Sequence, residues 1–148
     1  HDDGIYAALR LIIWLNHQNI PLHVINKRLP KPIATPDLYI DIRELTLWQP
    51  SEFVNQLTAS ITPLVNTRTK LTTLDGVRLD FDNGFGLVRS SNTSKSLTVR
   101  FGANNTDAFD TIVNTFLKAI DTLPYNDQQQ LSAFCQRLHQ AIFNSLTG

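Results

Sequence analysis

The stretch that decides the fold is residues 71–101, LTTLDGVRLDFDNGFGLVRSSNTSKSLTVRF. Apolar and polar residues alternate within it, so that Val77, Leu79 and Phe81 point one way while Arg78 and Asp80 point the other. This period of two predicts β-strands that have one core face and one polar face. Four strands are expected, over residues 71–74, 77–81, 85–89 and 96–101.

Two dipeptides in this stretch favour hairpin turns. Asp75-Gly76 and Asn83-Gly84 are pairs that accept the positive φ angles required by type I′ turns. Each pair stands between two expected strands. We therefore expect consecutive antiparallel strands, joined as a meander.

The segments on either side complete the fold prediction. Before the meander, alternation over 38–42 predicts a strand, and Pro50 stands at the start of a helix with one apolar stripe. After it, a second striped helix follows from Thr106, the expected N-cap. The order predicts an α+β fold: an antiparallel sheet of about four to five strands with two helices on one face.

Two further helices are expected at the ends of the chain. Asp2 and Asp3 can cap a helix that runs to about Asn16 and is apolar around nearly its whole circumference. Such a helix is normally buried on all sides, so we expect it to be the last helix of a domain that is otherwise missing. A final amphipathic helix is expected over about 127–146, for which the sequence suggests only packing or self-association.

Composition narrows the classes of function. The 148 residues carry 13 basic and 13 acidic side chains, and this zero net charge argues against a nucleic-acid partner. The longest apolar run, 11–15, is far shorter than the ~20 residues of a membrane span, so no membrane partner is expected. A single cysteine fits a reducing compartment, so we expect a cytoplasmic protein. The chain has no methionine, so it is expected to be part of a longer protein.

The loop over 90–95 is the strongest candidate for a binding site. It is longer than the neighbouring turns and has no apolar residue, and Arg89 precedes it while Lys95 ends it. Serine, threonine and asparagine side chains supply donors, and backbone N–H groups in a turn can form an anion-binding concavity. An arginine adds a planar fork that matches two phosphate oxygens. The spacing is compatible with a phosphate site and also with an ordinary solvated turn.

The remaining candidates favour structural roles. Asp80 and Asp82 share the polar strand face and could form an acid/base pair, although solvated carboxylates are the simpler interpretation. Cys135 lies on the apolar stripe of its helix, which indicates a buried structural cysteine. The four histidines are scattered and have no cysteine partner, so no metal site is expected. No catalytic residue is assigned.

Five segments, in order, resemble the C-terminal part of the bacterial phosphomannomutase/phosphoglucomutase family, within the α-D-phosphohexomutase superfamily. They are residues 2–8 (DDGIYAA), 33–37 (IATPD), 72–78 (TTLDGVR), 84–89 (GFGLVR) and 89–93 (RSSNT). The resemblance covers roughly residues 2–121. The loop together with the upstream TTLDGVR is the most specific part.

The resemblance implies a fold and a division into domains. It implies the TBP-like C-terminal domain of a phosphohexomutase, with an N-terminal helix and an extra C-terminal helix beside it. The implied parts are the end of a third domain (1–29), a hinge (30–35), a phosphate-binding fourth domain (36–121) and a helical extension (122–148).

The resemblance also implies a reaction and a site. These enzymes interconvert hexose 1-phosphate and hexose 6-phosphate of mannose or glucose through a hexose 1,6-bisphosphate, with Mg²⁺ held in another domain. The fourth domain binds the phosphate that is not reacting. Carried over by position, Arg89, Ser91, Asn92 and Thr93 form this contact, with the missing domains 1–3 as partners.

The chain departs from the family pattern in ways that limit what it can do alone. Lys95 replaces the proline that follows the family's loop, which leaves the loop less rigid and adds a positive charge. The phosphoserine, metal-binding and sugar-binding motifs are not in this sequence, so we expect no bound Mg²⁺ and no mutase activity from this chain by itself. Alternative interpretations are part of a phosphoglucosamine mutase, or a non-catalytic module that binds a phospho-ligand or a protein.

Overall fold

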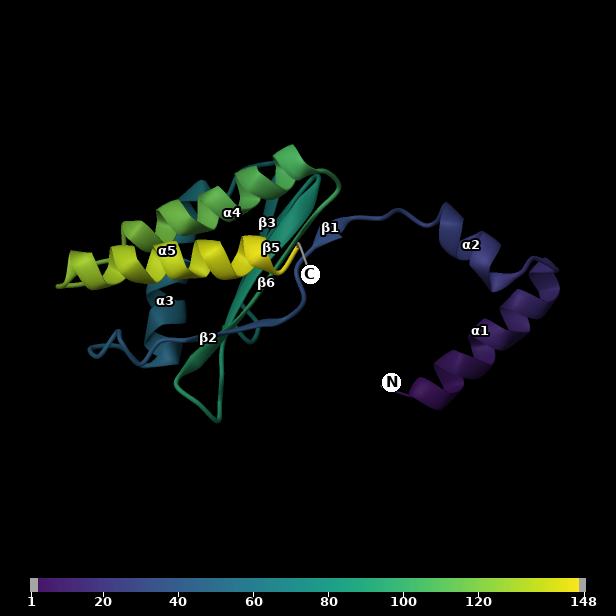
Figure 1. Cartoon of the computed structure of the whole chain (residues 1–148), viewed down its shortest axis with the longest axis horizontal. Helices are drawn as coiled ribbons and strands as arrows, with labels where there is room; N and C mark the ends of the chain where they lie inside the picture. The colour runs from purple at the N-terminus through teal and green to yellow at the C-terminus, as the bar shows by residue number, and fades with distance from the viewer. Residues whose placement is uncertain (1–2, 147–148) are drawn as a thin grey trace. The chain divides into compact units, whose positions relative to one another are not determined.

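The computed structural model describes residues 3–146. The chain divides between Lys31 and Pro32 into two compact units. The first unit consists of two helices, α1 (Gly4–Gln18) and α2 (Leu22–Arg28) (Figure 1). No residue of α1 is buried, and all of its large apolar side chains except Leu15 are at least 46% exposed: Ile5, Tyr6, Leu9, Leu11, Ile12, Ile13 and Trp14.

The ends of α1 follow from its capping residues. Asp3 caps the helix, because its carboxylate accepts a hydrogen bond from the amide of Tyr6 at 2.9 Å. Asp2, the other expected cap, lies outside the described residues. Asn19 ends the helix in the left-handed region, with φ of 50°.

The second unit is built on a six-stranded antiparallel sheet, so the predicted α+β class is confirmed. The strand order is β1-β6-β5-β4-β3, and β2 also pairs with β6. The strands are β1 (Ile33–Ala34), β2 (Leu38–Asp41), β3 (Thr69–Thr72), β4 (Val77–Phe81), β5 (Gly84–Ser90) and β6 (Ser96–Ala103). The two-residue β1, inside the segment expected to be a hinge, is the strand that the alternation pattern did not indicate.

The alternation along β4 produces the two faces that the sequence predicted. Val77 and Leu79 are fully buried, whereas Arg78 and Asp80 lie on the opposite, polar face. Thr98 of β6 alternates with buried Leu97 and so lies on the polar face, yet only 4% of it is exposed. The polar face is therefore closed over locally, at the position of Thr98.

Both predicted hairpin turns differ from the structure in position or in length. Both residues of Asp75-Gly76 have positive φ, at 57° and 139°. The turn is longer than the two-residue turn expected, however, because Thr72 pairs with Arg78. The hairpin predicted at Asn83-Gly84 is present, but its turn lies one residue earlier, at Asp82-Asn83, because Gly84 pairs with Phe81 inside the sheet. The predicted type I′ turn is wrong, since neither Asn83 nor Gly84 has positive φ.

Gly84 is required by packing instead of by turn conformation. A Cβ atom there would lie 2.7 Å from the side chain of Ile112 and 2.8 Å from Ala103 Cα. The glycine therefore lets β5 approach both β6 and a helix closely.

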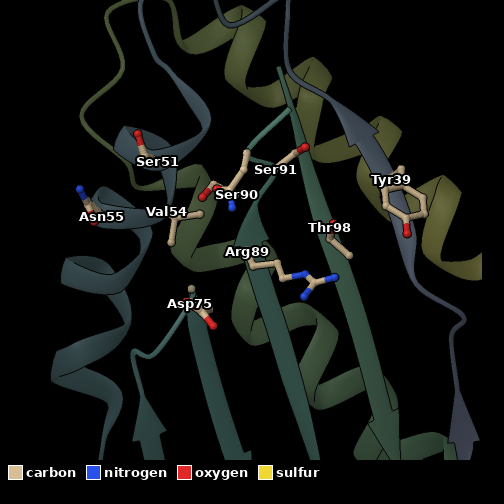
Figure 2. A pocket seen from close by; sticks show the side chains of 11 residues that line it. Tyr39, Ser51, Val54, Asn55, Asp75, Arg89, Ser90, Ser91 and Thr98 are labelled. Atoms are coloured by element: carbon tan, nitrogen blue, oxygen red, sulfur yellow. The ribbon is translucent and has the colours of Figure 1, made fainter. Parts of the chain in front are cut away.

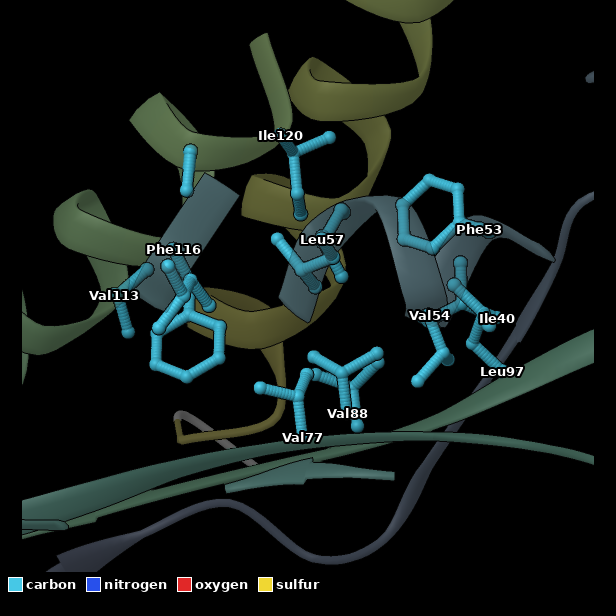
Figure 3. Close-up of a cluster of buried hydrophobic side chains, with 14 of the residues drawn as sticks. Ile40, Phe53, Val54, Leu57, Val77, Val88, Leu97, Val113, Phe116 and Ile120 are labelled. Atoms are coloured by element: carbon cyan, nitrogen blue, oxygen red, sulfur yellow. The ribbon is translucent and has the colours of Figure 1, made fainter. Parts of the chain in front are cut away.

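Three helices cover one face of the sheet, as Figures 1 and 3 show. They are α3 (Pro50–Ile61), followed by a 3₁₀ turn (Thr62–Leu64), α4 (Thr106–Asp121) and α5 (Gln128–Asn144). Pro50 begins α3 as predicted, but the N-cap of α4 is Asn105, because its side chain accepts from the amide of Ala108. Figure 3 shows Val77 and Val88 of the sheet facing Leu57 and Phe116 of the helices.

The last helix, α5, is part of this core. Its buried residues are Leu131, Phe134, Leu138 and Ile142. The ring of Phe134 meets that of Phe53 edge to face, with centroids 5.5 Å apart. Burial of a large apolar side chain contributes about 2 kcal/mol, so α5 stabilises the fold considerably.

Candidate functional site

The candidate loop connects β5 to β6 at one end of the sheet, and backbone hydrogen bonds fix its shape. The amide of Ser91 donates to the carbonyl oxygen of Ser96 at 2.9 Å, and the amide of Ser96 donates to that of Ser94 at 2.8 Å. The carbonyl oxygen of Lys95 accepts from the amide of Ile42 at 3.1 Å, just beyond β2. The polar loop is therefore an ordered turn that the adjacent strand supports.

Ser91 holds the loop together from inside. Its Oγ accepts from the amides of Thr93 and Ser94, both at 3.3 Å, and lies 2.9 Å from Ser94 Oγ. Ser94 Oγ in turn lies 2.8 Å from Ser96 Oγ. These bonds place the Ser91 hydroxyl at the base of the loop, where it holds the loop in shape.

Asn92 and Thr93 form the exposed tip of the loop. Within residues 3–146, neither side chain makes a hydrogen bond. Their amide and hydroxyl groups are therefore available to a ligand.

Arg89 lies on the polar face at the end of β5, and its side chain is exposed. In the described part of the chain its guanidinium makes no ion pair. Gly76 packs directly behind it, since a Cβ on Gly76 would lie 2.7 Å from Arg89 Cβ. The turn before β4 thus sets the position from which this arginine extends.

Arg89 belongs to a row of residues that crosses three strands. It pairs with Thr98 of β6, which pairs in turn with Tyr39 of β2. The three side chains share the polar face of the sheet, and Figure 2 shows the guanidinium of Arg89 extending toward Thr98.

A hollow of about 500 Å³ gathers most of the candidate residues (Figure 2). Its lining is Tyr39, Ser51, Val54, Asn55, Asp75, Gly76, Arg89, Ser90, Ser91, Asn92 and Thr98. Three of the four predicted residues, Arg89, Ser91 and Asn92, therefore meet in one place. Thr93 does not line this hollow but lines a neighbouring one with Lys95, which Ser91 and Asn92 also border.

Sequence reasoning missed the contributions of β2, α3 and Thr98 to this hollow. Counting outward from the expected loop at 90–95 would have placed Ser96 opposite Arg89, whereas the observed register pairs Arg89 with Thr98. Local pattern carries no such signal for Tyr39, Ser51 or Asn55, because strand pairing and helix packing bring them to the loop.

Charge in the hollow is unevenly distributed. Arg89 is the only cation among the lining residues and Asp75 the only carboxylate. No ion pair joins them among the described residues, and the guanidinium extends away from Asp75 in Figure 2. An anion is therefore favoured on the side of Arg89 that faces Thr98, and Asp75 repels it on the other side.

The two carboxylates considered as an acid/base pair have other partners. Asp80 accepts three hydrogen bonds from Arg78, at 2.6–3.0 Å, and these bonds raise the pKa of the Arg78 guanidinium. Asp82 lies 3.7 Å from Arg68. Arg78 also lies over the ring of Phe85, 4.2 Å from its centroid. These contacts account for both carboxylates structurally.

Cys135 is half-buried, and burial raises the pKa of its thiol to about 11, with Asp121 adding to the effect. At neutral pH the thiol stays protonated and is a weak nucleophile. This supports the interpretation of a structural cysteine.

No group of three or more metal-ligating side chains occurs within residues 3–146. Of the helices in the same residues, none is long and apolar enough to cross a membrane.

Comparison with known proteins confirms the resemblance to the phosphohexomutases. The chain is 37% identical over 123 residues to a phosphoglucomutase of Neisseria meningitidis serogroup B, which is 83% of this chain and 26% of that protein. It is 36% identical over 124 residues to a phosphomannomutase/phosphoglucomutase of Pseudomonas aeruginosa, with 82% of this chain and 26% of that protein covered. The chain thus spans about a quarter of the length of these curated relatives. No family model matches it.

A solved structure agrees with the sequence relationship. A phosphoglucomutase/phosphomannomutase family protein from Burkholderia thailandensis superposes with a TM-score of 0.62 at 30% sequence identity. The match covers 81% of this chain and 24% of that one.

Proposed function

We propose that this chain, a relative of the bacterial phosphoglucomutases, supplies the phosphate-binding domain of a phosphohexomutase. In this proposal the parent enzyme interconverts hexose 1-phosphate and hexose 6-phosphate in the cytoplasm. Its Mg²⁺ and its missing domains 1–3 lie outside this sequence. Residues 36–121 hold the phosphate that is not reacting. In this proposal the Mg²⁺ is held by the other domains and not by this chain.

One observation supports the phosphate contact above all others. The guanidinium of Arg89, which has no carboxylate partner among the described residues, lines the same hollow as Ser91 and Asn92. A phosphate dianion needs a cation together with several hydrogen-bond donors, and these three residues offer both.

The contact would assist the reaction from a distance. Phosphoryl transfer depends mainly on positioning and on stabilising charge. Binding energy from a remote phosphate can align the end of the substrate that reacts. Hydroxyls, an amide and a guanidinium recognise phosphate without reading the sugar, so in this proposal either phosphate of a hexose 1,6-bisphosphate can occupy the hollow.

Domain movement fits the same proposal. The division between Lys31 and Pro32 falls within the proline-rich stretch LPKP at 29–32. We infer that this stretch is the hinge that lets the phosphate-binding unit close over the substrate. The exposed apolar residues of α1 favour a role as a surface that the rest of the parent enzyme covers.

An NMR titration of the chain with glucose 1-phosphate tests the phosphate contact. The largest changes in amide chemical shift are expected in residues 89–96, with smaller changes at Asp75 and Gly76. If the loop amides do not move while others do, the ligand binds elsewhere and the assignment is wrong. If nothing moves at millimolar ligand, the proposed phosphate contact is rejected.

A further inference from the structure

Tyr39 lines the same hollow as Arg89 but is not needed to bind a phosphate. Tyr39 lies two strands from Arg89, with Thr98 between them. Because neighbouring strands are about 4.8 Å apart, Tyr39 and Arg89 are separated by roughly 10 Å at their Cα atoms. A phosphate at the guanidinium, followed by one sugar ring, spans this separation.

The side chain of Tyr39 is unusually free for so large a group. It is 72% exposed, although Leu38 and Ile40 on either side pack toward the core. Over residues 3–146 it forms no ring pair and no side-chain hydrogen bond. Tyrosine is common in strands. Because Tyr39 also lines the hollow, its ring is available for contact with a ligand there.

Thr98 forms the floor between the two residues. It lies on the polar face but is only 4% exposed, because neighbouring groups cover it. Arg89, Thr98 and Tyr39 all line the same hollow. Figure 2 shows these three side chains in that order across β5, β6 and β2.

Charge decides on which side of Arg89 the ligand extends. Asp75 lines the opposite side of the hollow and repels an anion there. A phosphate bound to the guanidinium on the side facing Thr98 therefore directs its substituent either over Tyr39 or into solvent.

We propose that the ring of Tyr39 packs against the sugar ring of the bound phosphate ester. One face of a pyranose carries C–H bonds while hydroxyls surround its rim, which suits an aromatic face with a polar end. The ligand class is therefore a hexose phosphate, and Tyr39 makes the site bind it more tightly than inorganic phosphate. This inference rests on the proposed phosphate contact at Arg89.

Titrations with two probes, glucose 1-phosphate and inorganic phosphate, test the role of Tyr39. Tyr39→Ala is expected to weaken glucose 1-phosphate binding roughly three- to tenfold and to leave inorganic phosphate binding unchanged. Tyr39→Phe keeps the ring and should bind both probes like the original chain. Leu74→Ala is a matched control, because Leu74 is 83% exposed beside Asp75 but does not line the hollow.

The outcomes separate this inference from the proposed function. If both probes bind through Arg89 but Tyr39→Ala affects neither, or affects both equally, the inference is overturned and the phosphate contact stands. A loss in Tyr39→Phe equal to that in Tyr39→Ala would assign the effect to the hydroxyl and also overturn it. If Arg89→Ala binds both probes like the original chain, the phosphate contact fails and the inference fails with it.

Discussion

At the scale of single residues, the site depends on small groups that position larger ones. Arg89 extends from a strand end that Gly76 contacts at close range, and Ser91 organises the loop through bonds to two amides. Neither Gly76 nor Ser91 needs to bind phosphate directly in order to matter. A change at either position should alter the place from which the arginine and the loop amides act.

Gly76→Ala tests this dependence. Gly76 has φ of 139°, and an added Cβ would lie 2.6 Å from the carbonyl oxygen of Val88 and 2.7 Å from Arg89 Cβ. We expect a loss of about 1–3 kcal/mol in the free energy of unfolding, measured by urea denaturation, together with weaker glucose 1-phosphate binding. Gly4→Ala is the control, because a Cβ there meets nothing within 4 Å. Unchanged stability and binding in Gly76→Ala would contradict the role given to this glycine.

Cys135 gives the fold a dependence on alkaline pH. Burial raises the pKa of its thiol from 9.0 to about 11, so between these values the unfolded chain loses the proton first. The buried, protonated thiol therefore contributes fully to the free energy of unfolding below pH 9, and this contribution is lost as the pH rises through 11. Thermal unfolding should show a larger fall in Tm between pH 8.5 and 11 for the original chain than for Cys135→Ala. Equal falls in Tm in the two proteins would mean that burial does not raise the pKa of the Cys135 thiol.

At the scale of elements, α5 is connected to the β5–β6 loop through the end of β2. Arg137 of α5 donates to the carbonyl oxygen of Asp41 at 2.8 Å and also binds the carboxylate of Glu44. The next residue along, Ile42, donates its amide to the carbonyl oxygen of Lys95. The C-terminal helix thus supports the exit of the loop in addition to filling the core.

Arg137→Ala should loosen the loop with little effect on overall stability, because exposed ion pairs contribute about 0–1 kcal/mol. The expected result is faster hydrogen exchange at the amides of Ile42 and Ser96, and weaker glucose 1-phosphate binding. Gln136→Ala, an exposed neighbour on the same helix, is the matched control. If exchange at Ile42 stays as slow as in the control, α5 has no influence on the loop.

At the scale of the whole molecule, local pattern predicted much of the fold and part of the site. The period of two placed β4 and β6, and the apolar stripes placed α3, α4 and α5, because these signals depend on neighbouring residues. Gly84 could not be interpreted in this way, since its role comes from the close approach of Gly102 and Ile112. Tyr39 likewise reaches Arg89 only through two strand pairings that the sequence does not display.

The central claim is that Arg89 holds the phosphate of a hexose phosphate, and an affinity measurement on paired variants tests it most directly. Isothermal titration with glucose 1-phosphate should show binding at least about tenfold weaker for Arg89→Ala, because charge-assisted hydrogen bonds are lost. Arg68→Ala removes an exposed arginine that pairs with Asp82 and does not line the hollow, so it should bind like the original chain. Equal affinity in all three proteins would contradict the claim.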